Sequence, residues 1–205
     1  DYINTKLEGH DVHWIREPYH KWIPLQWNKL KVFDMDIDEP VIVMDIDKLL
    51  INDYEEVINY PCKKDEFVSI PYWWNFVGTP YKMSGGFYKF WPKYNKNIWN
   101  TFVEDIPHWT NHYIKSGLTY GPVNGEFMYV QEHIETEMVL MPDAWFTRWL
   151  SNEDPEMCQK LSNKYIEVTG NQYLYNGNFH KDIKMVHFTN GMNKPHEWKS
   201  YERFR

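Results

Sequence analysis

The sequence predicts an α/β fold in which a mixed, largely parallel sheet is flanked by helices. Short apolar runs rich in β-branched residues, such as residues 41–44, are typical of buried strands. Stretches with helical spacing, such as residues 95–103, alternate with these runs, which is the pattern of α/β domains. The 205 residues are expected to form one domain, 1–205, and the missing initial methionine is compatible with a domain excised from a longer protein.

The elements are expected in a definite order along the chain. Apolar spacing predicts a helix over residues 23–33, followed by an acidic turn and the strand at 41–44. Asp53 and Glu56 have the spacing of a capping box, which predicts a helix over residues 53–59. Further strands are predicted at 67–70, 87–90, 139–142 and 184–188, further helices at 95–103 and 154–161, and a loop at 169–182.

Charge and cysteine content exclude several functional classes. The net charge is −7 and there is no basic run, which argues against nucleic acid or an anionic membrane as the main partner. No apolar stretch approaches the length that spans a bilayer. Two cysteines, Cys62 and Cys158, are too few for a disulfide framework, which fits a reducing compartment and predicts a cytoplasmic location.

Aromatic residues make up 18% of the chain, with 11 Trp and 15 Tyr. These rings either fill the core or line a groove for ring-shaped polar ligands such as sugars, and the composition favours neither explanation. Trp73, Trp74 and Trp91 are the candidates for such a groove, although a core position explains Trp91 at least as well.

The pair Asp45 and Asp47 follows the strand predicted at 41–44. In open α/β sheets, ligands bind outside the carboxyl ends of the strands. Two carboxylates this close repel each other unless a cation lies between them, and oxygen ligands suit Mg²⁺ or Mn²⁺. The sequence therefore predicts a divalent metal on Asp45 and Asp47 that holds a phosphorylated ligand.

Two other patterns that suggest metal ligands are better explained as surface features. The acidic run at 34–39 has no apolar strand before it and ends in a proline turn, so we expect a solvated turn. His108 and His112 could share one helical face, but without an obvious third ligand we expect a surface pair.

A third stretch completes the predicted site. His187 ends the last predicted strand, and neutral imidazole is a good ligand for Mn²⁺-type ions. Lys194 follows in a loop that contains Gly191, where it could neutralise a phosphate. Taken alone, His187 is more often a core histidine, but the nearby lysine favours a functional role.

These motifs, in this order, resemble those of the metal-dependent GT-A (Rossmann-like) glycosyltransferases, in particular the glycogenin-like, family 8 type. Residues 45–47 resemble the family's Asp-x-Asp motif, and residues 187–195 are similar to its closing His-x-x-Gly-x-x-Lys-Pro motif with one extra residue. Residues 28–33, 84–86 and 124–126 resemble three further donor-site segments. The resemblance covers roughly residues 27–198. More narrowly, the chain looks like the N-terminal glycosyltransferase domain of a large algal-virus (chlorella virus) protein that glycosylates capsid, which would place it in the host cytoplasm.

The resemblance implies a retaining enzyme that moves a hexose or deoxyhexose from a UDP-sugar to a hydroxyl of a glycan or glycoprotein acceptor. It also implies roles for individual residues. The metal, Mn²⁺ or Mg²⁺, would be held by Asp45, Asp47 and His187; the donor would contact Lys29, Asp45, Ser84, Gly85, Gly191 and Lys194; and Lys29 and Glu126 would be the catalytic residues. The chain departs from the family at Met83, where the family has Asn, and at Glu126-Phe127, where it has Asp-Gln.

Two alternatives stay open. Phosphatases of the haloacid-dehalogenase type also carry Asp-x-Asp after an apolar strand, with the first Asp as nucleophile and a bound Mg²⁺. They need a small residue and Thr after the motif, whereas Lys48-Leu49-Leu50 follow here. A non-catalytic carbohydrate-binding module would explain the aromatic content, but such modules are usually all-β.

Overall fold

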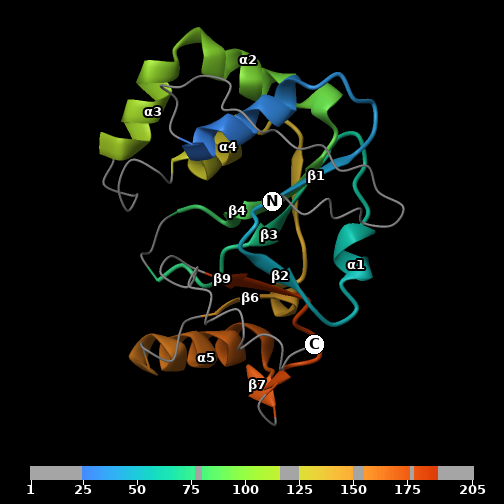
Figure 1. Cartoon of the computed structure of the whole chain (residues 1–205), viewed down its shortest axis with the longest axis vertical. Coiled ribbons are helices and arrows are strands. Elements are labelled where there is room, and N and C mark those ends of the chain that lie inside the picture. Colours follow the sequence, from blue (N-terminus) through green and yellow to red (C-terminus); the bar gives the residue numbers. More distant parts are fainter. Residues whose placement is uncertain (1–24, 77–79, 116–124, 150–154, 176–177, 189–205) are drawn as a thin grey trace, which may run out of the picture.

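The computed structural model describes residues 25–76, 80–115, 125–149, 155–175 and 178–188, which form two main sheets and a short hairpin (Figure 1). The first sheet has the order β1-β4-β3-β5, and the second has the order β2-β9-β6. The four-stranded sheet contains β1 (Val41–Met44), β3 (Glu66–Pro71), β4 (Met83–Phe90) and β5 (Glu137–Leu140). The three-stranded sheet contains β2 (Lys48–Leu50), β6 (Phe146–Trp149) and β9 (Met185–Phe188), and the hairpin pairs β7 (Leu174–Tyr175) with β8 (Asn178–Phe179).

The predicted class, α/β with a mixed sheet flanked by helices, is confirmed, but the expectation of largely parallel pairing is wrong. Among the described strands, only β3–β5 and β6–β9 are parallel pairs. The pairs β1–β4, β3–β4, β2–β9 and β7–β8 are antiparallel. An apolar run shows that a strand is buried, but it carries no information about the direction of the strand beside it.

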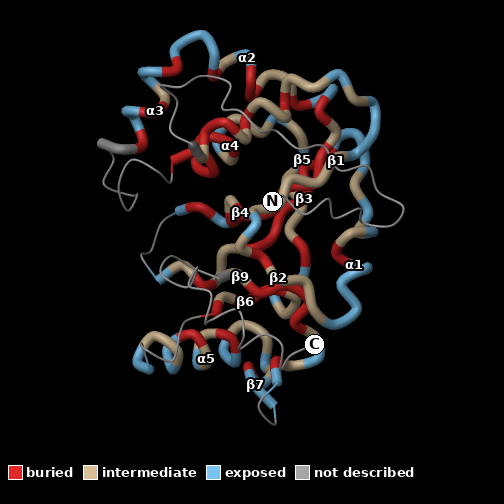
Figure 2. Tube along the Cα trace, in the orientation of Figure 1, coloured by how far each residue is buried: buried red, intermediate tan, exposed pale blue. Residues whose placement is uncertain are grey.

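Two hydrophobic cores lie on opposite faces of the four-stranded sheet. Side chains alternate along β3, so that Phe67 joins one core and Val68 the other; in β4, Tyr88 and Phe87 divide in the same way. The first core packs against 3₁₀ helix η1 (Leu25–Asp34) and helices α2 (Lys96–Glu104), α3 (Ile106–Lys115) and α4 (Glu126–His133). The second includes residues of the three-stranded sheet and helix α5 (Pro155–Thr169). The burial map shows both cores along the strands (Figure 2).

The predicted helix at 23–33 is a 3₁₀ helix where the structure describes it. Trp27, Leu30 and Phe33 are fully buried, and their spacing of three matches the three residues per turn of a 3₁₀ helix. The Trp27 ring stacks on Phe102 of α2 with centroids 5.3 Å apart. This packing fixes η1 against α2, while Phe33 stacks on Phe90 of β4 with centroids 4.4 Å apart, and together these contacts place Lys29.

The predicted capping box is wrong. Helix α1 (Glu55–Ile58) is a single turn whose N-cap, Tyr54, makes no side-chain capping bond. Asn52 and Asp53 have φ of +34° and +38°, in the left-handed region, so Asp53 does not adopt the extended backbone of a capping residue. The Glu56 carboxylate instead accepts a hydrogen bond from Lys184 at 3.0 Å.

The remaining predictions are largely confirmed. The predicted strands at 67–70, 87–90, 139–142 and 184–188 overlap β3, β4, β5 and β9, and the helices at 95–103 and 154–161 overlap α2 and α5. Two short 3₁₀ helices, η2 (Pro92–Tyr94) and η3 (Asp143–Trp145), were not predicted, and neither were β2, β6 and the hairpin inside the predicted loop.

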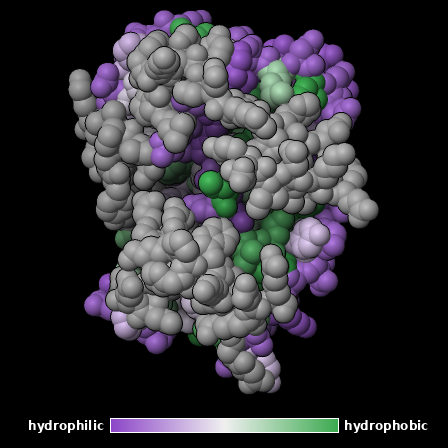
Figure 3. All heavy atoms as spheres, in the orientation of Figure 1, coloured by the Kyte–Doolittle hydropathy of each residue, from purple (hydrophilic) through white to green (hydrophobic). Residues whose placement is uncertain are grey.

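Three further observations concern the thiols, the helices and the surface. Both cysteines are free thiols. No helix within the described ranges is long and apolar enough to cross a bilayer. Hydrophilic surface spreads around α2, and hydrophobic atoms reach the surface nearer the middle of the same face (Figure 3).

Candidate functional site

The Asp-x-Asp motif lies in a tight turn that connects the two sheets. Asp45 directly follows β1, and its backbone N–H donates to Gly86 O of β4 at 3.1 Å. The N–H of Lys48 donates to Asp45 O at 3.3 Å, which closes a four-residue turn, and Lys48 then opens β2. The two carboxylates are therefore divided between the sheets, one at the end of β1 and the other at the start of β2.

On the side of the four-stranded sheet, Lys29 contacts Asp45, Gly85 and Glu126. We call these four residues the Lys29 cluster. The Lys29 ammonium lies 2.8 Å from Glu126 Oε1, donates to Gly85 O at 2.9 Å and lies 3.5 Å from Asp45 Oδ1. Burial opposes the charge, but Glu126 and Asp45 hold the pKa of Lys29 above its usual value. An ammonium has three protons, so this group has an acceptor for each of them.

Glu126 is the first residue of α4 and is buried. The N-terminus of a helix favours a negative charge, so the helix supports this carboxylate together with Lys29. Gly125 allows the close approach: a Cβ there would lie 2.6 Å from Tyr113 Cβ and 2.9 Å from Trp27 Cζ2. Only one carboxylate oxygen meets Lys29, and Oε2 has no hydrogen-bond partner within the described part of the chain.

On the side of the three-stranded sheet, Asp47, Lys48 and His187 form what we call the Asp47 cluster. His187 lies directly opposite Lys48 in the β2–β9 pair, and Arg148 lies opposite His187 in β6–β9. His187 Nε2 is 3.3 Å from Asp47 Oδ2, and Lys48 Nζ is 3.8 Å from Asp47 Oδ1. The strand register thus brings the Lys48 ammonium and the His187 imidazole beside the second carboxylate of the motif, with Arg148 next to His187 on the following strand.

Burial sets the protonation states of the Asp47 cluster. It lowers the pKa of Lys48 to about 8, although the negative charges of Asp45 and Asp47 act to raise this pKa. It also lowers the pKa of His187, with a further contribution from Lys48, so the imidazole is neutral at physiological pH. Burial raises the pKa of Asp47, but the hydrogen bond with His187 and the nearby ammonium of Lys48 outweigh it, and the net pKa is lowered.

Unpaired buried polar atoms gather at these two clusters. Asp47 Oδ1, Lys48 Nζ, Glu126 Oε2 and His187 Nδ1 are buried and make no hydrogen bond with any described residue. Leaving such an atom unpaired costs roughly 1–3 kcal/mol, so native proteins rarely retain several together without a ligand, ion or water. This concentration indicates a binding site.

The side chains fit a divalent metal by their chemistry. Two carboxylates and a neutral imidazole are ligands that suit Mn²⁺, and Asp47 Oδ1 is an unpaired oxygen of the kind that a metal would complete. Within the described residues, no three acidic, His or Cys side chains are gathered closely enough to form a metal site. The ammonium of Lys48 lies among the candidate ligands instead.

The predicted site residues fall into three sets. Lys29, Asp45, Gly85 and Glu126 meet in the Lys29 cluster, with Ser84 one residue before Gly85 in β4. Ser84 is buried, and its Oγ accepts a hydrogen bond from Gly86 N at 3.4 Å, so it holds the strand in place. Asp47 and His187 meet in the Asp47 cluster, whereas Gly191 and Lys194 lie outside the described residues.

Sequence reasoning missed Lys48 and Arg148. A lysine directly after two aspartates suggests a solvated side chain that screens their charge. The available signal was the apolar run Leu49-Leu50-Ile51, which marks a strand and therefore a fixed direction for Lys48. Arg148 lies in β6, which was not predicted as a strand.

The predicted aromatic groove is wrong for Trp74, because its ring is 1% exposed within the second core. Trp73 and Trp91 are partly buried, and each indole N–H donates to a backbone carbonyl, that of Asp143 at 3.0 Å and that of Cys62 at 2.9 Å. These rings are anchored parts of the framework. The rings supply packing area that the short strands alone would lack.

The patterns explained as surface features are confirmed. His108 and His112 are exposed on α3, with ring centroids 5.9 Å apart. Asp38 of the acidic turn is exposed and pairs with Lys93 at 3.1 Å.

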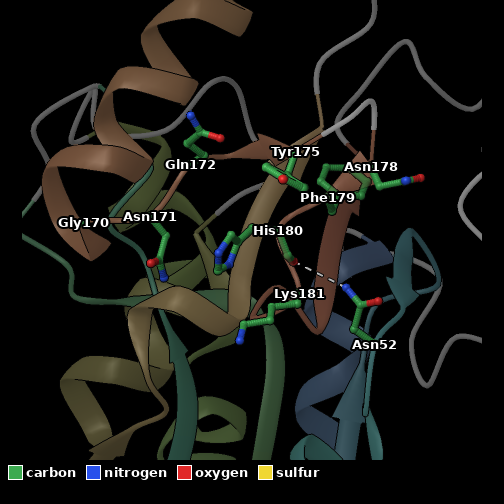
Figure 4. Close-up of a pocket in the computed structure, with 9 residues that line it drawn as sticks. All are labelled: Asn52, Gly170, Asn171, Gln172, Tyr175, Asn178, Phe179, His180 and Lys181. Carbon is green, nitrogen blue, oxygen red and sulfur yellow. Dashed lines mark hydrogen bonds between the residues drawn. The ribbon is translucent and has the colours of Figure 1, made fainter.

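A separate pocket of about 560 Å³ lies beside the hairpin β7–β8 (Figure 4). Its lining is rich in amide side chains, but two of them already have partners: Asn52 donates to Ile183 O at 2.9 Å and Asn171 donates to Asp182 at 3.0 Å. None of the buried unpaired atoms found in the described residues belongs to its lining. Four of those atoms belong instead to the Lys29 and Asp47 clusters, which makes these clusters the better candidate site.

Comparison with known proteins gives no match to a family model and no match to a curated protein. Three solved structures are similar to this chain over most of its length. The bifunctional glycosyltransferase WbbM has a TM-score of 0.47 and 14% identity over 87% of this chain, and the galactosyltransferase LgtC, solved with donor and acceptor sugar analogs, has 0.49 and 12% over 87%. Mouse xyloside xylosyltransferase 1 has 0.45 and 10% over 83%. The chain spans 37% of the WbbM structure and 64% of each of the other two.

Proposed function

We propose that this chain is a metal-dependent GT-A glycosyltransferase that transfers a hexose or deoxyhexose from a nucleotide-diphosphate sugar to a glycan hydroxyl. The observation that carries the proposal is the set of buried, unpaired polar atoms in the two clusters around the Asp-x-Asp turn. UDP is the proposed nucleotide, retention the proposed stereochemistry and a glycan or glycoprotein the proposed acceptor, all three on the motif resemblance.

The charges of the site match what a sugar diphosphate needs. The diphosphate leaving group carries negative charge that grows as the glycosidic bond breaks, and the sugar carbon becomes positive. Lys48 and Arg148 supply positive charge at one side of the turn, and Glu126 supplies a negative oxygen at the other. One region can therefore stabilise both developing charges.

Glu126 is the proposed catalytic residue, and Lys29 its positioning residue. The three protons of Lys29 are directed at Glu126, Gly85 and Asp45. In this arrangement Lys29 therefore positions the Glu126 carboxylate and strand β4 and does not contact the donor. Oε2 of Glu126 is left to face the cationic sugar carbon or to accept a hydrogen bond from the acceptor hydroxyl. Asp45, Asp47 and His187 are the proposed ligands of a Mn²⁺ or Mg²⁺ ion, which when bound would act as a Lewis acid on the diphosphate.

The rival functions gain no support from the structure. A carbohydrate-binding module is usually all-β, whereas helices α2, α3 and α4 cover a face of the four-stranded sheet here. A phosphatase would use Asp45 as nucleophile and needs a small residue and Thr after the motif, whereas Lys48 and Leu49 open β2 here. Hydrolysis of phosphate monoesters without binding of nucleotide sugars would favour the phosphatase.

Calorimetric titration with UDP, with and without Mn²⁺, tests the proposal. We expect micromolar binding that requires the metal in the wild-type chain and disappears in Asp47→Ala. Asp38→Ala is the matched control, because Asp38 is an exposed aspartate in the acidic turn. A panel of UDP-sugars would then identify the donor. Absence of UDP binding with any divalent metal would refute the UDP assignment, and equal binding by Asp47→Ala would refute the metal site.

A further inference from the structure

We propose that the ammonium of Lys48 is the built-in cation of the Asp-x-Asp turn, and that it competes with a divalent ion for Asp45 and Asp47. In the metal-free chain, Lys48 would offset the repulsion of the two carboxylates. Binding of the metal would then require the ammonium to move away. The metal in this inference rests on the proposed function, but the role of Lys48 rests on its own contacts.

The geometry directs Lys48 into the turn. The side chain is fully buried, and the strand register against His187 fixes the direction in which it leaves β2. Its Nζ lies 3.8 Å from Asp47 Oδ1 and makes no hydrogen bond within the described chain. A buried ammonium without hydrogen bonds is costly, so its position depends on the nearby carboxylates.

Gly86 provides the space that the ammonium occupies. A Cβ at Gly86 would lie 2.1 Å from Lys48 Cε, 2.2 Å from Lys48 Nζ and 3.3 Å from Asp45 Oδ2. The absence of a side chain at this point of β4 therefore lets the ammonium face Asp45 as well as Asp47. Both carboxylates of the motif meet the same small space, and Lys48 fills it.

Competition follows from the charges. A divalent ion that used both carboxylates would lie within a few Å of the ammonium, and two cations at that separation in a buried site repel strongly. Lys48 therefore lowers the affinity of the turn for the metal. Removing the charge at the same side-chain length should raise that affinity by roughly tenfold or more, given the effective dielectric constant of buried sites.

The test is titration with Mn²⁺ alone, without nucleotide, followed by calorimetry and by the electron paramagnetic resonance signal of free Mn²⁺. Lys48→Met removes the charge and keeps the length, and Lys48→Arg keeps the charge. Lys64→Met is the matched control for the change in net charge, because Lys64 is exposed and pairs with Asp38 at 3.7 Å, away from the turn. Gly86→Ala is a second way to displace the ammonium, because the added Cβ would take its place without changing the net charge of the chain.

We expect Mn²⁺ to bind at least tenfold more tightly to Lys48→Met than to Lys64→Met, with Lys48→Arg close to the wild type. Gly86→Ala should also bind more tightly, and it tests the inference if Lys48→Met does not fold. A change of less than threefold in the folded variant, or weaker binding, would overturn the inference. UDP binding is a separate readout: the proposed function fails if UDP does not bind, whereas this inference fails only on the Mn²⁺ affinities.

Discussion

The Lys29 cluster and the Asp47 cluster are two halves of one site, and they differ in how far their polar groups are paired. Lys29 has three acceptors within 3.5 Å. In the Asp47 cluster, Asp47, Lys48 and His187 each keep a buried polar atom without a hydrogen bond to a described residue. This contrast predicts that the Lys29 cluster is organised in advance and that the Asp47 cluster is completed by the ligand it binds.

Removal of the Lys29 ammonium should destabilise the Lys29 cluster. In Lys29→Met, the buried carboxylate of Glu126 loses its positive partner, and removing one member of a buried ion pair typically costs about 3–5 kcal/mol. We expect that decrease in the free energy of unfolding, measured by urea denaturation. The double variant Lys29→Met/Glu126→Gln should recover most of it, and Lys93→Met, at an exposed pair, should change little. A decrease of less than about 1 kcal/mol in the free energy of unfolding of Lys29→Met would show that the ion pair does not hold the Lys29 cluster together.

Binding of Mn²⁺ and UDP should stabilise the Asp47 cluster. With Mn²⁺ and UDP at a hundred times the dissociation constant, we expect a gain of about 2.7 kcal/mol in the free energy of unfolding. The gain should be seen as a higher melting temperature and should be lost on chelation. Asp47→Asn should abolish the gain, whereas Asp38→Asn should retain it. Full stabilisation of Asp47→Asn would place the binding site elsewhere.

Two neighbouring glycines should respond differently to the same added methyl group. A Cβ at Gly85 would lie 2.6 Å from Phe127 Cβ, so Gly85→Ala must shift α4 and should cost about 2 kcal/mol. A Cβ at Gly86 would overlap the end of the Lys48 side chain, which can move, and would lie 3.3 Å from Asp45 Oδ2, so Gly86→Ala should cost less than about 1 kcal/mol. Chemical denaturation of both variants measures the difference. Equal losses would mean that the two halves are equally rigid.

The cysteines extend the comparison beyond the site, with the smallest expected effect. Burial raises the pKa of the Cys62 thiol to about 11, and its Sγ lies 3.4 Å from Lys89 O of β4. In Cys158→Ser, alkylation of Cys62 should therefore be slow at pH 8 and rise about tenfold per pH unit up to about pH 11. Because the thiol of the unfolded chain ionises near pH 9, folding stability should fall as the pH rises above 9. A rate that levels off below pH 9.5 would contradict the closed surroundings of Cys62.

Much of the site could be predicted from the sequence because its residues stand at the ends of strongly patterned strands. The run at 41–44 placed Asp45 and Asp47, and the run at 184–188 placed His187. These side chains lie together because β2 pairs with β9, and pairing between distant strands is not encoded in either run alone. The same limit explains the wrong expectation of largely parallel strands.

The missed features depend on packing between distant segments. The burial of Lys48 follows from its register against His187, and the missing capping box follows from the left-handed backbone at Asn52 and Asp53. Neither can be derived from local propensity. The burial of Trp74 is a third such feature, because composition shows how many rings a chain has but not which of them the core uses.

One residue, Ile46, is all that separates the two carboxylates of the motif. Ile46 is 90% exposed, β1 ends directly before Asp45, and β2 begins directly after Asp47. Two peptide steps reach at most about 7 Å, so the chain itself limits how far apart the Cα atoms of the two aspartates can lie. The loops elsewhere can lengthen without altering that span, whereas one extra residue at Ile46 would release it.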